Sequence, residues 1–358
     1  MSIFLLILQV VIVISLLIFF HELGHFLSAR AVGVPVEEFG FGYPPRLLKI
    51  GDWKGTEITL NWIPFGGFVR PKGEADETVE GGMAASPAWK RLFIAISGPL
   101  MNFLIGILIL IVIYSAIGVP ASDQALITQV SPGSPALIAG LETGDIIATV
   151  NDLEITSLEQ LIETINDNVG QEITMTIERE GQMQTVTLIP RENPPEGEGA
   201  VGIGLSNPLK PAPISQSIGN AFKTTGYIIR ETVLLPVRLI RGSVDPAMAR
   251  PVGYKGIYDI YNQAVSMDQE SDLATAEPLP IYTLSIIANI SLALGITNLL
   301  PIPALDGGRI LFTLPELLFG KRIPQKWENV VNTVFFVLLI VLMVYITILD
   351  FTNPIVIP

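Results

Sequence analysis

The stretch Phe19-Phe20-His21-Glu22-Leu23-Gly24-His25-Phe26 decides how this chain is interpreted, and it ends an apolar run that begins at Ile3. Histidines four residues apart share one helical face, which is the geometry that tetrahedral Zn2+ requires of two ligands. In this His-Glu-x-x-His pattern, Glu22 is expected to be the base that takes a proton from metal-bound water. The structural alternative is that both histidines merely close a transmembrane helix at the membrane interface.

The composition indicates an integral membrane protein. The chain has 358 residues, of which 49% are hydrophobic and 15% charged, and its mean hydropathy is +0.53. This length allows a bundle of membrane spans and one small soluble domain. With no cysteine and two histidines in all, a third protein ligand for a metal must be a carboxylate or a weaker oxygen donor. The net charge of -13 argues against a nucleic-acid partner.

Four apolar segments predict transmembrane helices, over about residues 3–31, 92–117, 281–300 and 330–349. The first lacks a basic leader and a small-residue cleavage site, so we expect it to be retained rather than removed as a signal peptide. Residues 1–120 and 280–358 would then form the two halves of a membrane-embedded core. The fold class is a polytopic α-helical membrane protein with inserted elements.

A β-hairpin is predicted at about residues 55–72. Residues 57–63 alternate at the period of a strand, and Gly66-Gly67 would supply a turn or a bulge. Neighbouring aromatic residues suggest that the hairpin contacts lipid or the helical bundle. A soluble surface hairpin is the alternative.

Residues 121–206 change to short strands, turns and many acids, which predicts a small soluble αβ domain. Residues 207–279 follow as an amphipathic helix, too charged to span and better placed in the interface plane, and an acid-rich linker over 268–277.

The segment Asn298-Leu299-Leu300-Pro301-Ile302-Pro303-Ala304-Leu305-Asp306-Gly307-Gly308-Arg309 lies between the last two predicted spans. Its prolines and glycines predict irregular chain, which is tolerated at membrane depth only where it is buried in protein or lines a cavity. A carboxylate there needs a strong partner, and a metal ion is one. Asp306 is therefore the candidate third ligand, with Glu316 as its rival and Asp350 as a remote alternative.

Charge distribution gives an independent test of topology, because loops rich in Lys and Arg stay cytoplasmic. Residues 30–91 and 321–326 are basic, whereas 121–277 is dominated by acids. This places both termini and the αβ domain outside. His25 then lies about five residues, or roughly 7 Å, above the cytoplasmic end of its helix. Asp306 falls near the same end and Asp350 near the opposite one.

Two resemblances follow from these motifs. Residues 131–155, SPGSPALIAGLETGDIIATVNDLEI, resemble a PDZ domain of bacterial membrane proteases, a domain that captures peptide C-termini as an added strand. Gly202 and Gly204, in Val201-Gly202-Ile203-Gly204-Leu205, are the candidate carboxylate loop. Gating of access by the domain's bulk is the alternative.

The His-Glu-Leu-Gly-His-Phe motif, the segment 98–102 (Gly-Pro-Leu-Met-Asn) and the Asn298-to-Gly308 segment are similar to those of RseP-type site-2 proteases, which are zinc intramembrane metalloproteases. The resemblance implies one Zn2+ per chain on His21, His25 and Asp306, with Glu22 as the general base and Asn298 as a polar site residue. One PDZ domain is recognisable here, whereas two tandem domains are known in the family.

The resemblance also implies regulated intramembrane proteolysis of single-span proteins, such as anti-sigma factors or remnant signal peptides, in a bacterial cytoplasmic membrane. We expect the hairpin, through Ile63, Gly66 and Gly67, to pair with an unwound substrate. Asn102 or Asn298 would hold the substrate backbone, although Asn102 could equally make an interhelical hydrogen bond. The functional alternatives are a non-catalytic PDZ-bearing membrane scaffold and a metal-ion transporter, the latter weakened by the nearly uniformly apolar first and fourth spans.

Overall fold

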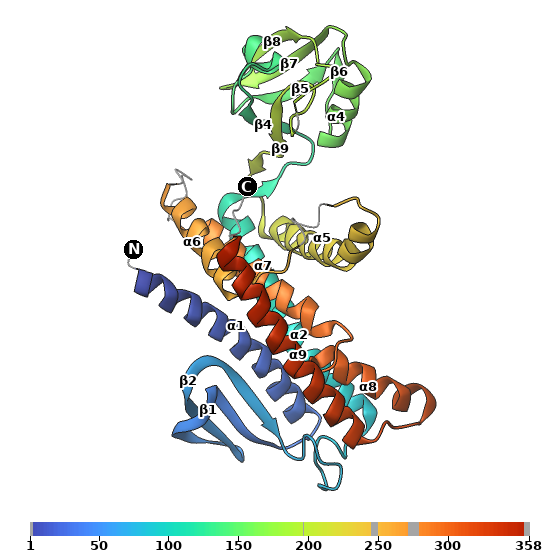
Figure 1. Ribbon diagram of the computed structural model, residues 1–358. Coiled ribbons are helices and arrows are strands. Elements are labelled where there is room, and N and C mark those ends of the chain that lie inside the picture. Colours follow the sequence, from blue (N-terminus) through green and yellow to red (C-terminus); the bar gives the residue numbers. More distant parts are fainter. Residues whose placement is uncertain (1–2, 196, 245–249, 271–278, 354–358) are drawn as a thin grey trace. The chain divides into compact units, whose positions relative to one another are not determined.

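Figure 1 shows the computed structural model, which describes residues 3–195, 197–244, 250–270 and 279–353. The chain divides into two units, Met1–Ile113 with Ile218–Pro358, and Tyr114–Ser217. Among the described residues, four helices are long and apolar enough to cross a membrane: α1 (Ile3–Ala31), α2 (Ala88–Ile117), α7 (Ile281–Leu299) and α9 (Gln325–Thr352). The second and fourth begin several residues earlier than the sequence predicts, because polar helical turns precede their apolar cores.

Helices α1 and α2 cross where each has a glycine. A Cβ atom on Gly24 would collide with the carbonyl oxygen of Ser97, and one on Gly98 would collide with the imidazole of His25. The two backbones therefore approach more closely than any larger residue would permit. This crossing brings the histidine face of α1 against α2.

The hairpin is larger than predicted and turns elsewhere. Its strands are β1 (Val36–Trp53) and β2 (Thr56–Pro71), joined at Lys54-Gly55, where both residues have positive φ. Gly66 also has positive φ, but it lies within β2 beside a register shift, so it marks a bulge and not the turn. The alternation over 57–63 identified only part of the second strand.

Both strands bend, so the hairpin forms a small sheet of four segments. Residues 38–41 pair with 57–60 on one side and with 67–70 on the other, while 48–53 pair with 56–60. Among the described residues, no strand pairs with the second side of 63–71. That edge lies beside α1, where Gly66 meets Ile18 and the ring of Phe41 stacks on Phe19 at 4.9 Å between centroids.

Between α7 and α8 the chain is irregular over residues 300–305, and α8 (Asp306–Phe319) follows as a helix that the sequence did not predict. The expectation that Gly307 and Gly308 loosen the backbone is wrong. Both lie in the first turn of α8, where a Cβ atom would collide with the backbone of residues 299–303. These glycines let α8 fold back against the preceding loop, and they hold Asp306 at its first position.

The unit Tyr114–Ser217 contains a six-stranded sheet with the path β8-β7-β5-β4-β9, and β6 pairs with β5. Its strands are β4 (Ala125–Val130), β5 (Ile146–Val150), β6 (Leu153–Glu154), β7 (Ile173–Arg179), β8 (Gln182–Leu188) and β9 (Ile203–Ser206). Helices α3 (Pro135–Ile138) and α4 (Leu158–Asp167) complete it, with Ser134 and Ser157 as N-caps. Ile147, Leu161 and Ile177 belong to its fully buried core. A short pair, β3 (Val119–Pro120) and β10 (Leu209–Lys210), closes its base.

Two further helices precede α7 along the chain: α5 (Ile214–Ile240), which begins at the end of this unit, and α6 (Tyr254–Glu270). The sequence predicted the first and treated the second as linker. Helix α6 packs through Tyr261 against Leu6 and Val10 of α1. The predicted loop over 268–277 begins inside α6, and residues 271–277 lie outside the described part of the chain.

Candidate metal centre

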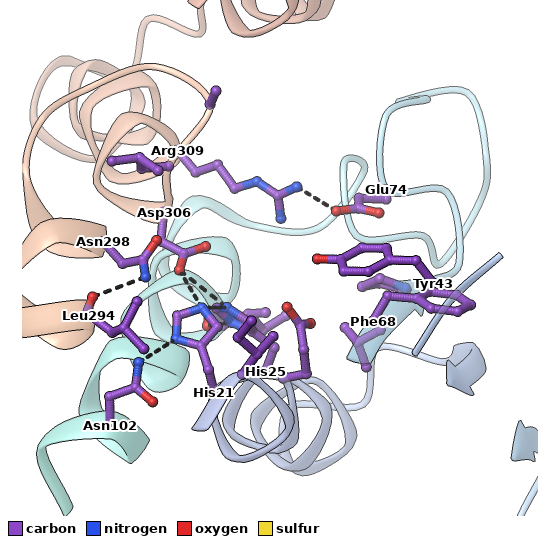
Figure 2. Close-up of a pocket in the computed structure, with 17 residues that line it drawn as sticks. His21, His25, Tyr43, Phe68, Glu74, Asn102, Leu294, Asn298, Asp306 and Arg309 are labelled. Atoms are coloured by element: carbon purple, nitrogen blue, oxygen red, sulfur yellow. Dashed lines mark hydrogen bonds and ion pairs between the residues drawn. The ribbon is translucent and has the colours of Figure 1, made fainter. Parts of the chain in front are cut away.

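Three predicted ligands converge at one point, although Asp306 is far from the histidines in sequence (Figure 2). The Nε2 atoms of His21 and His25 lie 3.2 Å apart. Asp306 Oδ2 lies 3.0 Å from the first and 3.3 Å from the second. All three side chains are buried. One face of α1 thus supplies two donor atoms, and the first residue of α8 supplies the third.

These residues fit a zinc ion. Zinc–ligand bonds of 2.0–2.1 Å at tetrahedral angles separate neighbouring ligand atoms by about 3.3 Å, close to the distances found here. Asp306 Oδ2 is buried and accepts no hydrogen bond from the described residues. A buried carboxylate oxygen without a donor is costly unless a cation satisfies it. Two imidazoles and one carboxylate also match the donor set of catalytic zinc sites, which leave a fourth position open.

The outer nitrogens of both imidazoles have partners that orient the rings. His25 Nδ1 lies 2.7 Å from the carbonyl oxygen of Ile94, so it donates its proton there and leaves Nε2 free to coordinate. His21 Nδ1 lies 3.1 Å from the amide of Asn102, whose Oδ1 has no partner among the described residues. A metal on His21 Nε2 requires a proton on Nδ1. Exchanging the amide oxygen and nitrogen of Asn102 places its oxygen against Nδ1 and so provides that acceptor.

Glu22 faces the same space as the ligands. It lines a cavity of about 390 Å3 together with His21, His25 and Asp306. A Cβ atom on Gly67 would lie 4.0 Å from Glu22 Cγ, so Glu22 lies close to β2. A base at this position can reach water held beside the three ligands.

The two rival carboxylates have other partners. Glu316 forms an ion pair with the buried guanidinium of Arg91. Asp350 is fully buried, pairs with Arg250 at 2.5 Å, and accepts hydrogen bonds of 2.9 Å from the backbone N–H groups of Gly253 and Gly256. It therefore anchors the start of α6 to α9. Neither carboxylate is placed with the histidines.

The remaining predicted residues lie at varying distances from the ligands. Asn298 lines the cavity and donates to the carbonyl oxygen of Leu294 at 3.0 Å. Asn102 is 1% exposed and turned to His21, which is the interhelical contact left open by the sequence. Ile63 is exposed on the outer segment of β2, outside the residues that line the cavity. Gly202 and Gly204 belong to the other unit, at the start of β9, where Gly202 has positive φ.

Sequence reasoning missed three polar or charged residues that line this cavity: Tyr43, Glu74 and Arg309. Arg309 ends the segment that contains Asp306, and its position three residues later on a helix would have placed it on the same face. Helix α8 was not predicted, so that signal went unused. Nothing in the local sequence points to Tyr43 or Glu74.

Comparison with known proteins identifies the family. The family model described as "Peptidase family M50" matches residues 9–342. The chain belongs to peptidase family M50. This is the site-2 protease family, and with four helices in the described residues that are long and apolar enough to cross a membrane, the chain is a multi-pass membrane metalloprotease.

Individual relatives agree with this assignment to M50. A Clostridium perfringens protein, named as a candidate zinc metalloprotease, is 33% identical over 344 residues, covering 95% of this chain and 97% of the relative. The zinc metalloprotease RasP of Geobacillus kaustophilus is 28% identical over 422 residues, covering 95% and 96%. Among solved structures, the PDZ domain of an SdrC-like protein from Listeria monocytogenes covers 23% of this chain and 87% of its own, at 20% identity and a TM-score of 0.21.

Proposed function

We propose that this M50 peptidase binds one Zn2+ ion on His21, His25 and Asp306 and hydrolyses peptide bonds within transmembrane segments of single-span proteins. The observation that carries the proposal is the convergence of two Nε2 atoms and Asp306 Oδ2 beside a cavity that Glu22 also lines. When bound, zinc supplies a Lewis acid that activates water. Glu22 accepts the proton from that water and delivers it to the leaving amine nitrogen.

An apolar substrate is supported by a second cavity, of about 820 Å3, lined by α1, α6, α9 and the hairpin. Ile18 and Tyr43 line both cavities, so the apolar space adjoins the polar one. A helix hides its carbonyl groups in its own hydrogen bonds and must unwind before attack. The unpaired edge of 63–71, with Ile63, Gly66 and Gly67, is suited to pair with the unwound segment, and Asn298 is suited to hold its backbone.

We also propose on which side of the membrane each part of the chain lies and which proteins it meets. The unit Tyr114–Ser217 acts as the PDZ domain outside the membrane, and the metal centre lies toward the cytoplasmic side of a bacterial cytoplasmic membrane. The PDZ domain either captures substrate C-termini at Gly202 and Gly204 or gates access by its bulk. Substrates are single-span proteins already shortened outside the membrane, such as anti-sigma factors or remnant signal peptides.

The direct test uses the purified full chain in lipid nanodiscs with a single-span protein as substrate. We expect about one zinc per chain, and Glu22→Gln should retain that zinc while cleavage falls by at least about 10²-fold, the contribution of a general base. His21→Ala should lose both zinc and cleavage. Cleavage retained by Glu22→Gln would remove Glu22 from the mechanism, and a wild-type chain without zinc or cleavage would indicate a scaffold.

A further inference from the structure

The side chain of Arg309 lines the same cavity as the metal ligands, and its guanidinium extends toward Glu74 (Figure 2). Arg309 follows Asp306 by three residues on α8, so both side chains project from the same helical face. Its side chain keeps 40% of its accessible surface, through the space that it lines. Arg309 therefore belongs to the same wall of the cavity as Asp306, and its guanidinium extends from that wall to Glu74.

Glu74 holds this guanidinium in place. Arg309 Nη2 lies 2.5 Å from Glu74 Oε1, and Glu74 belongs to the loop that follows β2. A guanidinium carries five N–H donors in a rigid fork. Within the described part of the chain, the contact with Glu74 is the only hydrogen bond that the guanidinium of Arg309 donates, so its other N–H groups remain available to a molecule in the cavity.

The ion pair with Glu74 also keeps Arg309 from pairing with the carboxylates of the metal site. Without Glu74, the nearest carboxylates on the cavity wall for Arg309 would be Asp306 and Glu22, both of which the metal chemistry needs unpaired. Pairing with Glu74 compensates the charge of Arg309 and keeps it away from them. The partly exposed guanidinium is thereby held in one place while its remaining N–H groups stay free to bind a substrate.

We propose that Arg309 is a catalytic residue that donates hydrogen bonds to the carbonyl oxygen of the scissile peptide bond, with Glu74 as its positioning residue. This inference rests on the proposed peptidase function. As the water oxygen bonds to the carbonyl carbon, Glu22 takes the water proton and the π electron pair moves to the carbonyl oxygen, which Arg309 stabilises. When the carbon–nitrogen bond breaks, that pair reforms the carbonyl and Glu22 gives its proton to the amine. Donors already held in place where negative charge develops stabilise that charge without further reorganisation.

The test compares Arg309→Met, Arg309→Lys and Glu74→Gln in the full chain with a single-span substrate. We expect Arg309→Met to lower kcat by about 10²-fold with KM changed less than about threefold, the behaviour of an oxyanion donor. Arg309→Lys should recover part of the loss, and Glu74→Gln should be intermediate. Zinc content should stay at the wild-type value in all three. Arg322→Met is the matched control, because Arg322 also pairs with acids but does not line this cavity.

A binding measurement separates this role from a structural one. A pseudopeptide with a phosphinate at the mapped cleavage site mimics the charged oxygen, so its affinity should fall by about 10²-fold in Arg309→Met. Affinity for uncleaved substrate, measured with Glu22→Gln in both chains, should change little. A raised KM with normal kcat, lost zinc, or equal loss of both affinities would overturn the inference. Failure of the wild-type chain to cleave would instead overturn the proposed function.

Discussion

At the scale of single residues, the metal centre depends on side chains that do not touch the ion. The Nδ1 atoms of His21 and His25 contact Asn102 and the Ile94 carbonyl, and these contacts set which nitrogen of each ring faces Asp306. Asn102 is a polar residue within a span, and its partner became clear only when α2 was placed against α1. Its chemistry is that of an orienting group, which raises the basicity of its histidine.

Asn102 gives a prediction at this scale. Asn102→Leu fills a similar volume but removes the acceptor for His21 Nδ1, so zinc affinity should fall by about 10- to 100-fold. Asn102→Asp keeps an acceptor oxygen and should bind zinc more tightly than the leucine variant. Competition of each purified chain with a zinc chelator measures this. Equal zinc affinity in wild type and Asn102→Leu would show that Asn102 is not needed to orient the ring.

At the scale of elements, the centre exists because three backbone segments approach unusually closely. Gly24 and Gly98 let α1 and α2 touch, and Gly307 and Gly308 let α8 fold against the loop before it. In each contact the glycine brings its own backbone against the neighbouring segment, and a backbone cannot move aside as a flexible side chain can. One helix crossing and one contact between a helix and a loop thus depend on four positions without side chains, and the ligand positions follow from them.

The crossing of α1 and α2 yields the second prediction. The Cβ atom of Gly98→Ala would collide with the His25 and His21 rings, so this variant should lose most of its bound zinc while still inserting in the membrane. Gly226→Ala is the matched control, since Gly226 lies in helix α5 with no atom within 4 Å of an added Cβ. Zinc per chain, measured by elemental analysis, compares the two. Full zinc content in Gly98→Ala would mean that the helices can separate freely.

At the scale of the whole molecule, topology decides what the site can reach. Along the chain, one span, α2, separates the basic segment before it from the acidic Tyr114–Ser217 unit, and one span, α7, separates that unit from the basic segment before α9. The proposed sidedness rests on that asymmetry of charge. It would place the ligands near the cytoplasmic end of α1 and the PDZ domain in the opposite compartment.

The absence of cysteine makes this sidedness directly testable. Glu163 is exposed on α4, and Glu80 is exposed in the loop before α2. Each can be replaced singly by cysteine, as Glu163→Cys and Glu80→Cys. In intact cells, a membrane-impermeant thiol reagent should label Glu163→Cys and should label Glu80→Cys only after the membrane is opened. The cysteine-free parent is the control for background labelling. The reverse pattern would invert the topology and place the site near the outer surface.

The sequence alone determined the four spans, the histidine pair and that a third protein ligand must offer oxygen. A span needs about twenty apolar residues, and two ligands on one helix obey a local period, so both are visible in short windows. The distribution of charge already set Asp350 apart, whereas only the tertiary structure paired Glu316 with Arg91, 225 residues away, and so separated it from Asp306. It alone revealed α8, the true hairpin turn and the cavity residues Arg309 and Glu74. These depend on which distant groups neutralise each buried charge, and that is settled by packing, not by local periodicity.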